Sequence, residues 1–256
     1  MKFWQNCESS FSTSCEENGA YLVLNSCSNQ VLKLDKNWNF VSSTFVLAPL
    51  RMKALSRSNK TIQIFITGLH GVYKLDGNLS LINQYSFYQL NSRGLFYNTS
   101  NDHLIVCSNR LDGLFIFDNN LTLIRTVSFG ASGTNAIYEY DNRVYVATKN
   151  GHVFVLENEI VVFNFSTHCN SIDSILIDQY NCLTTLCSNI VYNYYLNGSF
   201  TGVYKNLSYP QLSYMDFDIN GDLIFSGLNG LYIFSTNITK YESITPANNT
   251  CIDKSN

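Results

Sequence analysis

The chain has 256 residues, of which 45% are hydrophobic and only 14% are charged, and its formal net charge at pH 7 is −3. The hydrophobic share is sufficient for a substantial core, whereas the acidic balance disfavours a general nucleic-acid binder, which normally carries a basic face. No stretch approaches the roughly 18 consecutive apolar residues of a membrane span. With three prolines and 14 glycines there is no Pro- or Gly-rich linker, so we expect one domain.

Residues 1–18 are polar and lack the apolar core of a signal peptide, which by itself predicts a cytosolic protein. We expect residues 1–18 to form a leader, residues 19–245 a single folded domain, and residues 246–256 a polar tail. The domain is built from repeats, which are described below, and the first repeat shows no clear first strand. The leader is therefore expected to supply a closing strand to the first or the last sheet, with Lys2–Asn6 as the candidate segment.

A repeating unit organises the chain, and its clearest copy covers residues 93–129. In this copy four short apolar runs are separated by turns rich in Asn, Asp, Gly and Ser, which predicts four antiparallel strands. A repeat of about 40 residues with four strands is typical of a β-propeller blade. The sequence therefore predicts an all-β fold, a six-bladed β-propeller of four-stranded antiparallel blades. The third run of each copy begins at Val31, Val72, Leu114, Val153, Val191 and Leu231.

The third copy also carries a family resemblance. Val106-Cys107-Ser108 stands where NHL-type repeats have Val-Ala-Asp, Phe117-Asp118 matches their Phe-Asp, and Ser128-Phe129-Gly130 matches their Phe-Gly strand end. The chain thus resembles the NHL-repeat-like six-bladed β-propeller family, best in copies two to four and poorly in copies one and six. The resemblance implies a fold and not a function, because such propellers include binding modules, RNA-binding domains and enzymes.

Three of the eight cysteines share one repeat position. Cys27, Cys107 and Cys187 each end a second strand, where the fourth copy has Ala147, so we predict small buried core thiols. Cys7 and Cys15 are close enough in sequence to pair in an oxidising compartment. The five cysteines outside this repeat position, Cys7 and Cys15 among them, are odd in number, which argues against a complete disulfide framework, and no C-x-x-C motif supports a zinc site.

Nine Asn-X-Ser/Thr sequons occur, and Asn78, Asn120 and Asn197 fall in the turn after the third strand. Asn is favoured in such turns for its backbone conformation, so these residues are read either as turn formers or as glycosylation acceptors. The sequons and the cysteines leave an extracellular location open if a signal peptide precedes residue 1.

Few residues point to catalysis. The four histidines share no ligand spacing, and neither a G-x-S-x-G motif nor a phosphate-binding loop is present. Calcium-dependent lactonase propellers, which this fold resembles, place acidic and Asn side chains in the central channel, which first strands line. Turn capping is the competing explanation for the acidic residues on or beside first strands here. They are Asp141, Asp173, Asp178, Asp216 and Asp218.

The main functional prediction rests on four candidate ligand-binding residues: Arg51, Arg93, Arg110 and Tyr88. They are expected in loops at one end of the propeller, and a face rich in Arg and Tyr is typical of a binding hot spot. We predict a non-catalytic scaffold that binds a protein or glycan partner without a cofactor. The alternative is a metal-dependent lactonase- or hydrolase-type enzyme with acidic residues in the channel, and a weaker alternative is an RNA-binding propeller. The sequence does not indicate an oligomeric state.

Overall fold

The computed structural model describes residues 9–12, 21–25, 28–35, 37, 39–56, 61–87, 91–92, 94–110, 112–130, 133–178, 180–206, 212–217, 223–227 and 230–234. Every helix or strand in this part of the chain is a β-strand. The same residues contain no helix with the length and apolar character needed to span a bilayer.

Within these residues the strands form six antiparallel sheets, numbered here in chain order. The first sheet contains β1 (Ser9–Ser12), β2 (Tyr21–Asn25), β3 (Gln30–Leu34) and β4 (Phe40–Phe45). The second contains β5 (Pro49–Ser56), β6 (Ile62–Gly68), β7 (Gly71–Asp76) and β8 (Leu81–Ser86). The third contains β9 (Gly94–Asn98), β10 (His103–Cys107), β11 (Leu114–Phe117) and β12 (Leu123–Val127).

The fourth sheet contains β13 (Thr134–Tyr140), β14 (Arg143–Thr148), β15 (His152–Glu157) and β16 (Ile160–Ser166). The fifth contains β17 (Ser174–Ile177), β18 (Cys182–Cys187), β19 (Ile190–Tyr195) and β20 (Phe200–Asn206). The sixth contains β21 (Leu212–Phe217), β22 (Leu223–Gly227) and β23 (Gly230–Phe234).

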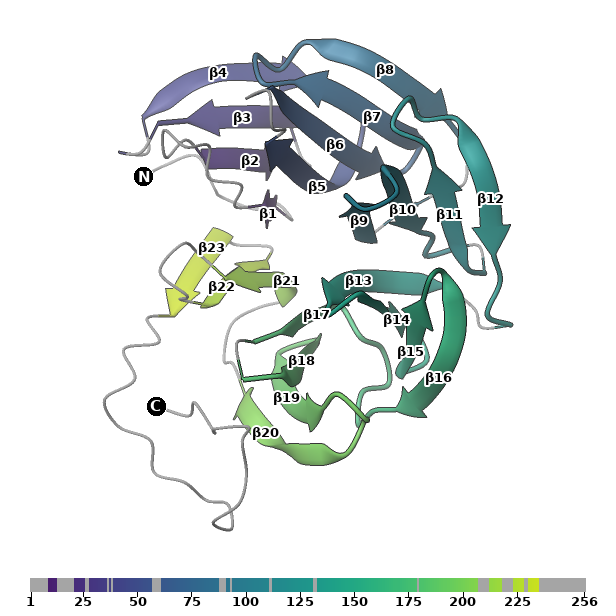
Figure 1. Cartoon of the computed structure of the whole chain (residues 1–256). Helices are drawn as coiled ribbons and strands as arrows, with labels where there is room; N and C mark the ends of the chain where they lie inside the picture. The colour runs from purple at the N-terminus through teal and green to yellow at the C-terminus, as the bar shows by residue number, and fades with distance from the viewer. Residues whose placement is uncertain are drawn as a thin grey trace.

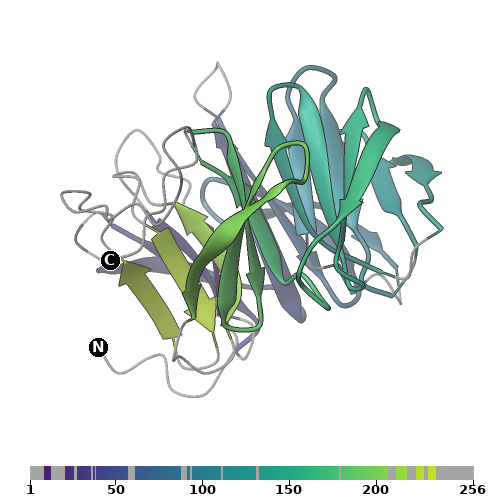
Figure 2. The ribbon, with the colours of Figure 1, turned by 90° about the horizontal axis from the view of Figure 1, so that it is seen from below.

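The six sheets surround a common centre. Figure 1 shows the first strand of each sheet toward the middle and the fourth strands, such as β8, β12 and β16, on the rim. Figure 2 shows the sheets standing side by side when the ring is seen from below. This arrangement confirms the prediction of an all-β propeller built from four-stranded antiparallel sheets.

The burial pattern follows from the position of each strand in its sheet. The second strands β10 and β18 are buried along almost their whole length, because neighbouring sheets cover both of their faces. The rim strand β16 instead alternates between exposed and half-buried residues, because one face meets solvent. The core therefore lies between adjacent sheets.

An aspartate at the end of the third strand builds the turn to the rim strand. Asp118 Oδ1 accepts hydrogen bonds from the backbone N–H groups of Asn120 and Thr122, at 2.9 and 2.7 Å. The left-handed residue of this turn is the buried Leu121, with φ of 62°. Leu79 takes the same conformation in the second sheet. In both turns the residue in the left-handed conformation is a leucine. A preference of asparagine for that conformation therefore does not explain why Asn78 and Asn120 precede these leucines.

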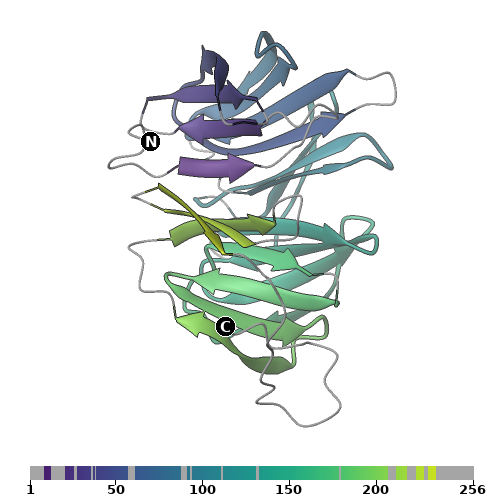
Figure 3. The same ribbon diagram turned by 90° about the vertical axis from the view of Figure 1, so that its left-hand side faces the viewer.

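The ring is closed where its first and last described sheets meet. β1 pairs with β2 in the first sheet and also packs against β21, β22 and β23 of the sixth. Figure 3 shows the purple strands of the first sheet directly beside the yellow strands of the sixth. A segment of the leader thus supplies the innermost strand of the first sheet, at Ser9–Ser12, whereas Lys2–Asn6 lie outside the described residues.

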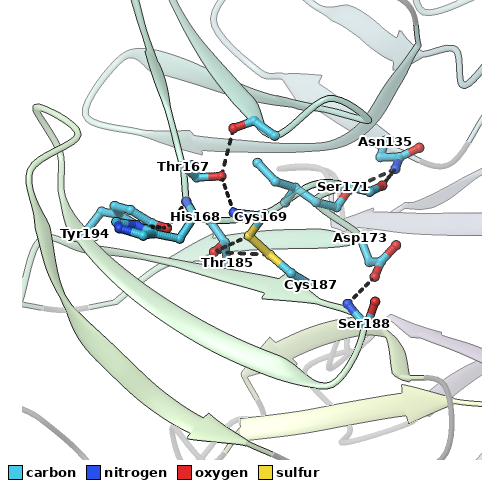
Figure 4. Close-up of a disulfide and its surroundings, with 12 residues drawn as sticks. Asn135, Thr167, His168, Cys169, Ser171, Asp173, Thr185, Cys187, Ser188 and Tyr194 are labelled. Carbon is cyan, nitrogen blue, oxygen red and sulfur yellow. Dashed lines mark hydrogen bonds between the residues drawn. A yellow bond between two sulfur atoms is a disulfide. The ribbon is translucent and has the colours of Figure 1, made fainter.

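A disulfide corrects part of the cysteine prediction. Cys187 is bonded to Cys169, which lies in the segment between β16 and β17, with 5.7 Å between the two Cα atoms (Figure 4). Cys182 is also disulfide-bonded. Cys107 is a buried free thiol, as predicted, and Cys7, Cys15 and Cys27 lie outside the described residues. The prediction was wrong for Cys187 because the repeat does not show which loop packs against that position.

Candidate active site at the mouth of the central channel

A small pocket of about 50 Å³ lies where the first strands converge. Among the described residues, its walls come from the first strands β5, β9, β13, β17 and β21 of sheets two to six. The lining residues are Arg51, Met52, Gly94, Leu95, Ala136, Ile137, Tyr138, Ser174, Ile175, Tyr214, Met215 and Asp216.

Three of these residues form a compact polar group. The guanidinium carbon of Arg51 lies 4.8 Å from the centre of the Tyr214 ring, a cation–π contact. The Tyr214 hydroxyl donates a hydrogen bond to Asp216 Oδ2 at 3.2 Å. Arg51 is only 9% exposed. The pocket therefore holds a buried cation, a phenol and a carboxylate in direct succession.

Both tyrosines of the pocket are held in their neutral form. Burial raises the pKa of Tyr214 well above its ordinary value, and the nearby Asp216 raises it further. Burial, followed by the charges of Asp216 and Asp178, raises the pKa of Tyr138 to about 12. Two phenols that keep their protons at neutral pH can donate hydrogen bonds to a developing negative charge.

Of the four residues of the predicted arginine and tyrosine face, the structure describes Arg51 and Arg110. Arg51 was expected in the loop before the first strand of the second sheet. It lies instead on that strand, β5 (Pro49–Ser56), and its side chain lines the pocket. Arg110 is exposed after β10. Arg93 and Tyr88 lie outside the described residues. A ligand-binding role for Arg93, Arg110 and Tyr88 stays a prediction.

The acidic candidates divide between the pocket and the turns. Asp216 lines the pocket, as the channel alternative expects. Asp178 Oδ1 caps the β17–β18 turn by accepting from the N–H groups of Tyr180 and Cys182, at 2.8 and 3.0 Å. Asp173 Oδ2 accepts from the N–H of Ser188 at 2.7 Å. Asp141 is exposed in the β13–β14 turn, and Asp218 lies outside the described residues.

All four histidines lie away from the pocket. His103 contacts Glu159, His152 contacts Ser166, and His168 packs against Tyr192 and Phe200. His70 lines a different cavity, between the first and second sheets. In the part of the chain that the structure describes, no three His, Cys, Asp or Glu side chains gather to hold a metal ion.

Sequence reasoning missed Tyr138 and Ser174 as pocket residues. Each lies on a first strand, and strand alternation alone decides which side chains reach the channel. The signal was present in the repeat, because β13 and β17 were recognised as first strands. Which residues of β13 and β17 face the pocket depends on how these strands pair with their neighbours, and the repeat does not show that pairing.

The fold and the convergent first strands define the chain as a β-propeller. Among solved structures it resembles a streptogramin B lyase, with 13% identity and a TM-score of 0.70 over 92% of this chain and 85% of that one. It also resembles a catalytically inactive histidine-to-alanine variant of virginiamycin B lyase from Staphylococcus aureus with quinupristin. That match has 9% identity and a TM-score of 0.70 over 93% of this chain and 87% of that one. No protein-family model and no curated protein sequence matches the chain.

These comparisons correct the main functional prediction. The prediction of a non-catalytic scaffold for a protein or glycan partner is wrong, because the two solved structures named above are those of lyases. They support the enzyme alternative better. At these identities the likeness establishes the fold alone, and the NHL-type resemblance stays a prediction.

Proposed function

We propose that the chain is an enzyme built on a six-bladed propeller, with its reaction pocket at the channel mouth. The observation that carries the proposal is the succession of Arg51, Tyr214 and Asp216 in a buried pocket. Desolvated groups of opposite charge with perturbed neighbours are common at catalytic sites. The lyase activity of the structural neighbours supports a catalytic use of this fold.

The chemistry best suited to these groups is acid–base cleavage of an ester or lactone. The Asp216 carboxylate is the base that takes a proton, from an attacking water in hydrolysis or from the carbon beside the carbonyl in an elimination. The neutral hydroxyl of Tyr138 donates to the carbonyl oxygen as negative charge develops on it, and Tyr214, whose one proton is donated to Asp216 Oδ2, orients that carboxylate. The leaving alkoxide or carboxylate takes up the proton in the last step, which leaves the pocket unchanged.

The size of the pocket limits what can enter it. About 50 Å³ accommodates one or two small groups and not a whole drug-sized molecule. The scissile group therefore enters from the channel mouth while the rest of the substrate remains outside. Arg51 provides positive charge at this mouth, which favours a substrate with electron-rich oxygen atoms near the bond that is broken.

A panel of p-nitrophenyl esters and simple lactones tests the proposal, with product release followed by absorbance and by a pH indicator. We expect turnover of at least one substrate, and we expect Asp216→Asn and Tyr214→Phe to lower kcat/KM by about 100-fold or more. Asp141→Asn, which removes an exposed carboxylate from a turn, is the matched control and should retain full activity.

Two outcomes would contradict the proposal. One is that no ester or lactone of the panel is turned over by the unmodified protein. The other is that Asp216→Asn and Asp141→Asn have the same kcat/KM as the unmodified protein. Far-ultraviolet circular dichroism of each variant separates lost chemistry from lost folding.

A further inference from the structure

A second cavity, of about 590 Å³, lies between the first and second sheets and away from the channel. Its walls come from the end of β4, the third strand β7 and the rim strand β8. Its volume falls within the range of small-molecule sites, roughly 300–1,000 Å³. The lining side chains among the described residues include no Asp, Glu, Lys or Arg, so the cavity suits an uncharged ligand.

The origin of this cavity is visible when equivalent rim positions are compared. In each sheet the third strand carries an apolar run, and the first residue of that run pairs with a residue of the rim strand. We call this rim residue the first inward position. The residue two further along is the second inward position. The first inward positions are Thr44, Tyr85, Val127 and Phe165 in sheets one to four. The second inward positions are Val46, Phe87, Phe129 and Thr167.

In sheets two to four, at least one inward position holds an aromatic ring, which packs on the third strand of the next sheet. Tyr85 lies 5.0 Å from Phe117 and Phe87 lies 5.8 Å from Phe115, measured between ring centres. Phe129 stacks on Phe154 at 4.9 Å. Phe165 contacts Tyr194 at 6.3 Å. These rings fill the outer part of each interface.

The first sheet has no ring at either inward position. Thr44 and Val46 face Tyr73 and Leu75, which are the equivalents of Phe115 and Phe117, and all four line the cavity. A threonine and a valine are much smaller than the Tyr85 and Phe87 pair that fills the next interface. The cavity is therefore the space that an aromatic side chain from the rim strand occupies in the interfaces that follow sheets two, three and four.

We propose that this cavity binds a neutral aromatic small molecule, whose ring takes the place of the missing side chain against Tyr73. Gln84, which pairs with Tyr73 on the adjacent strand, offers an amide to a polar substituent. Burial raises the pKa of Tyr73, so its hydroxyl is neutral and can donate a hydrogen bond to the ligand. The site is separate from the channel and does not depend on the proposed reaction.

Fluorescence titration with N-phenyl-1-naphthylamine, an uncharged aromatic probe, tests this site. We expect saturable binding to the unmodified protein. Thr44→Tyr restores a ring at the first inward position and should weaken binding at least tenfold. Ser43→Tyr adds the same ring one residue earlier, on the exposed opposite face of β4, and should change affinity less than twofold.

Equal affinity in all three proteins, or no binding to the unmodified protein, overturns the proposal. Photolabelling with benzophenone provides a decision that needs no variant and holds even if Thr44→Tyr does not fold. Adducts in residues 44–47, 70–75 or 81–87 that N-phenyl-1-naphthylamine suppresses support the site. Adducts confined to other segments overturn it.

Discussion

The Nζ atom of Lys74, on β7, lies 2.9 Å from the carbonyl oxygen of Asn119 in the next sheet of the ring. It also donates to Asn119 Oδ1 at 3.0 Å and lies 5.5 Å from the centre of the Phe65 ring. Lys33 occupies the equivalent position in the first sheet and donates to the carbonyl of Gly77 in the second, at 3.0 Å. A lysine at the same repeat position therefore forms a hydrogen bond across each of two successive interfaces, Lys33 to the second sheet and Lys74 to the third.

Replacing this buried amine should weaken the second interface. Lys74→Met retains the aliphatic stem but leaves the Asn119 oxygens without their donor, so we expect a loss of about 2 kcal/mol in the free energy of unfolding. Urea denaturation measures this value. Lys149→Met, at an exposed site, is the control. Equal losses of stability in the two variants would show that the hydrogen bonds of Lys74 do not stabilise the interface.

The disulfide between Cys169 and Cys187 should contribute more. Their sequence separation is 18 residues, and a crosslink over such a loop stabilises the folded state by roughly 3 kcal/mol in the chain-entropy account. We expect the double variant Cys169→Ala/Cys187→Ala to unfold at correspondingly lower urea concentration. Peptide mapping without reductant should recover the two cysteines in one linked fragment, and separate fragments would disprove the bond.

Glu159 joins the third and fourth sheets and predicts an acid-sensitive interface. Its Oε1 lies 2.9 Å from His103 Nδ1 and accepts from Asn101 at 3.2 Å, and its Oε2 accepts from Arg125. Burial alone would raise the pKa of Glu159, but the hydrogen bonds from His103 and Arg125 lower it below its ordinary value of 4.5. The stabilisation is therefore present above about pH 4.5 and is lost as the pH falls further.

Glu159→Gln should accordingly be less stable than the unmodified protein at pH 7, with a smaller difference at pH 3. Thermal unfolding across this range checks both values. Glu157→Gln removes the carboxylate of an exposed ion pair with Arg143 and should change stability less than Glu159→Gln does at pH 7. A Glu159 effect that does not change with pH would contradict the assignment.

Tyr138 predicts loss of stability in alkaline solution. Its pKa is raised from 10.0 to about 12 in the folded protein, so the stabilisation is complete below pH 10 and is lost between pH 10 and 12. We expect Tyr138→Phe to remove roughly 2 kcal/mol of this pH dependence. Tyr85→Phe serves as the control. Identical alkaline melting profiles for the two variants would show that Tyr138 ionises as an ordinary phenol.

The repeat made most of the fold predictable, because apolar runs and Asn/Asp turns recur at nearly constant spacing. β1 escaped recognition, because Ser9–Ser12 has little apolar pattern and is a strand through its pairing with β2. The pairing of Cys187 was likewise hidden, because it depends on the path of the β16–β17 segment and not on the repeat.

The candidate site was predictable only in part. Asp216 was one of five acidic candidates of the enzyme alternative, because it lies on a first strand, and turn capping was its competing explanation. Arg51 was expected on an exposed loop, but β5 extends far enough to bring its side chain against Tyr214. Contacts between residues so distant in sequence depend on closure of the whole ring, which local pattern does not report.

The packing of β1 against the sixth sheet has a mechanical consequence. The first and last described sheets are not consecutive along the chain, and among the described residues the seam between them is the packing of β1 against β21, β22 and β23. Tension applied between Ser9 and Phe234 loads this seam before any other interface. Under force the ring is expected to open there first, and the sheets should then detach in turn from the two ends toward the middle.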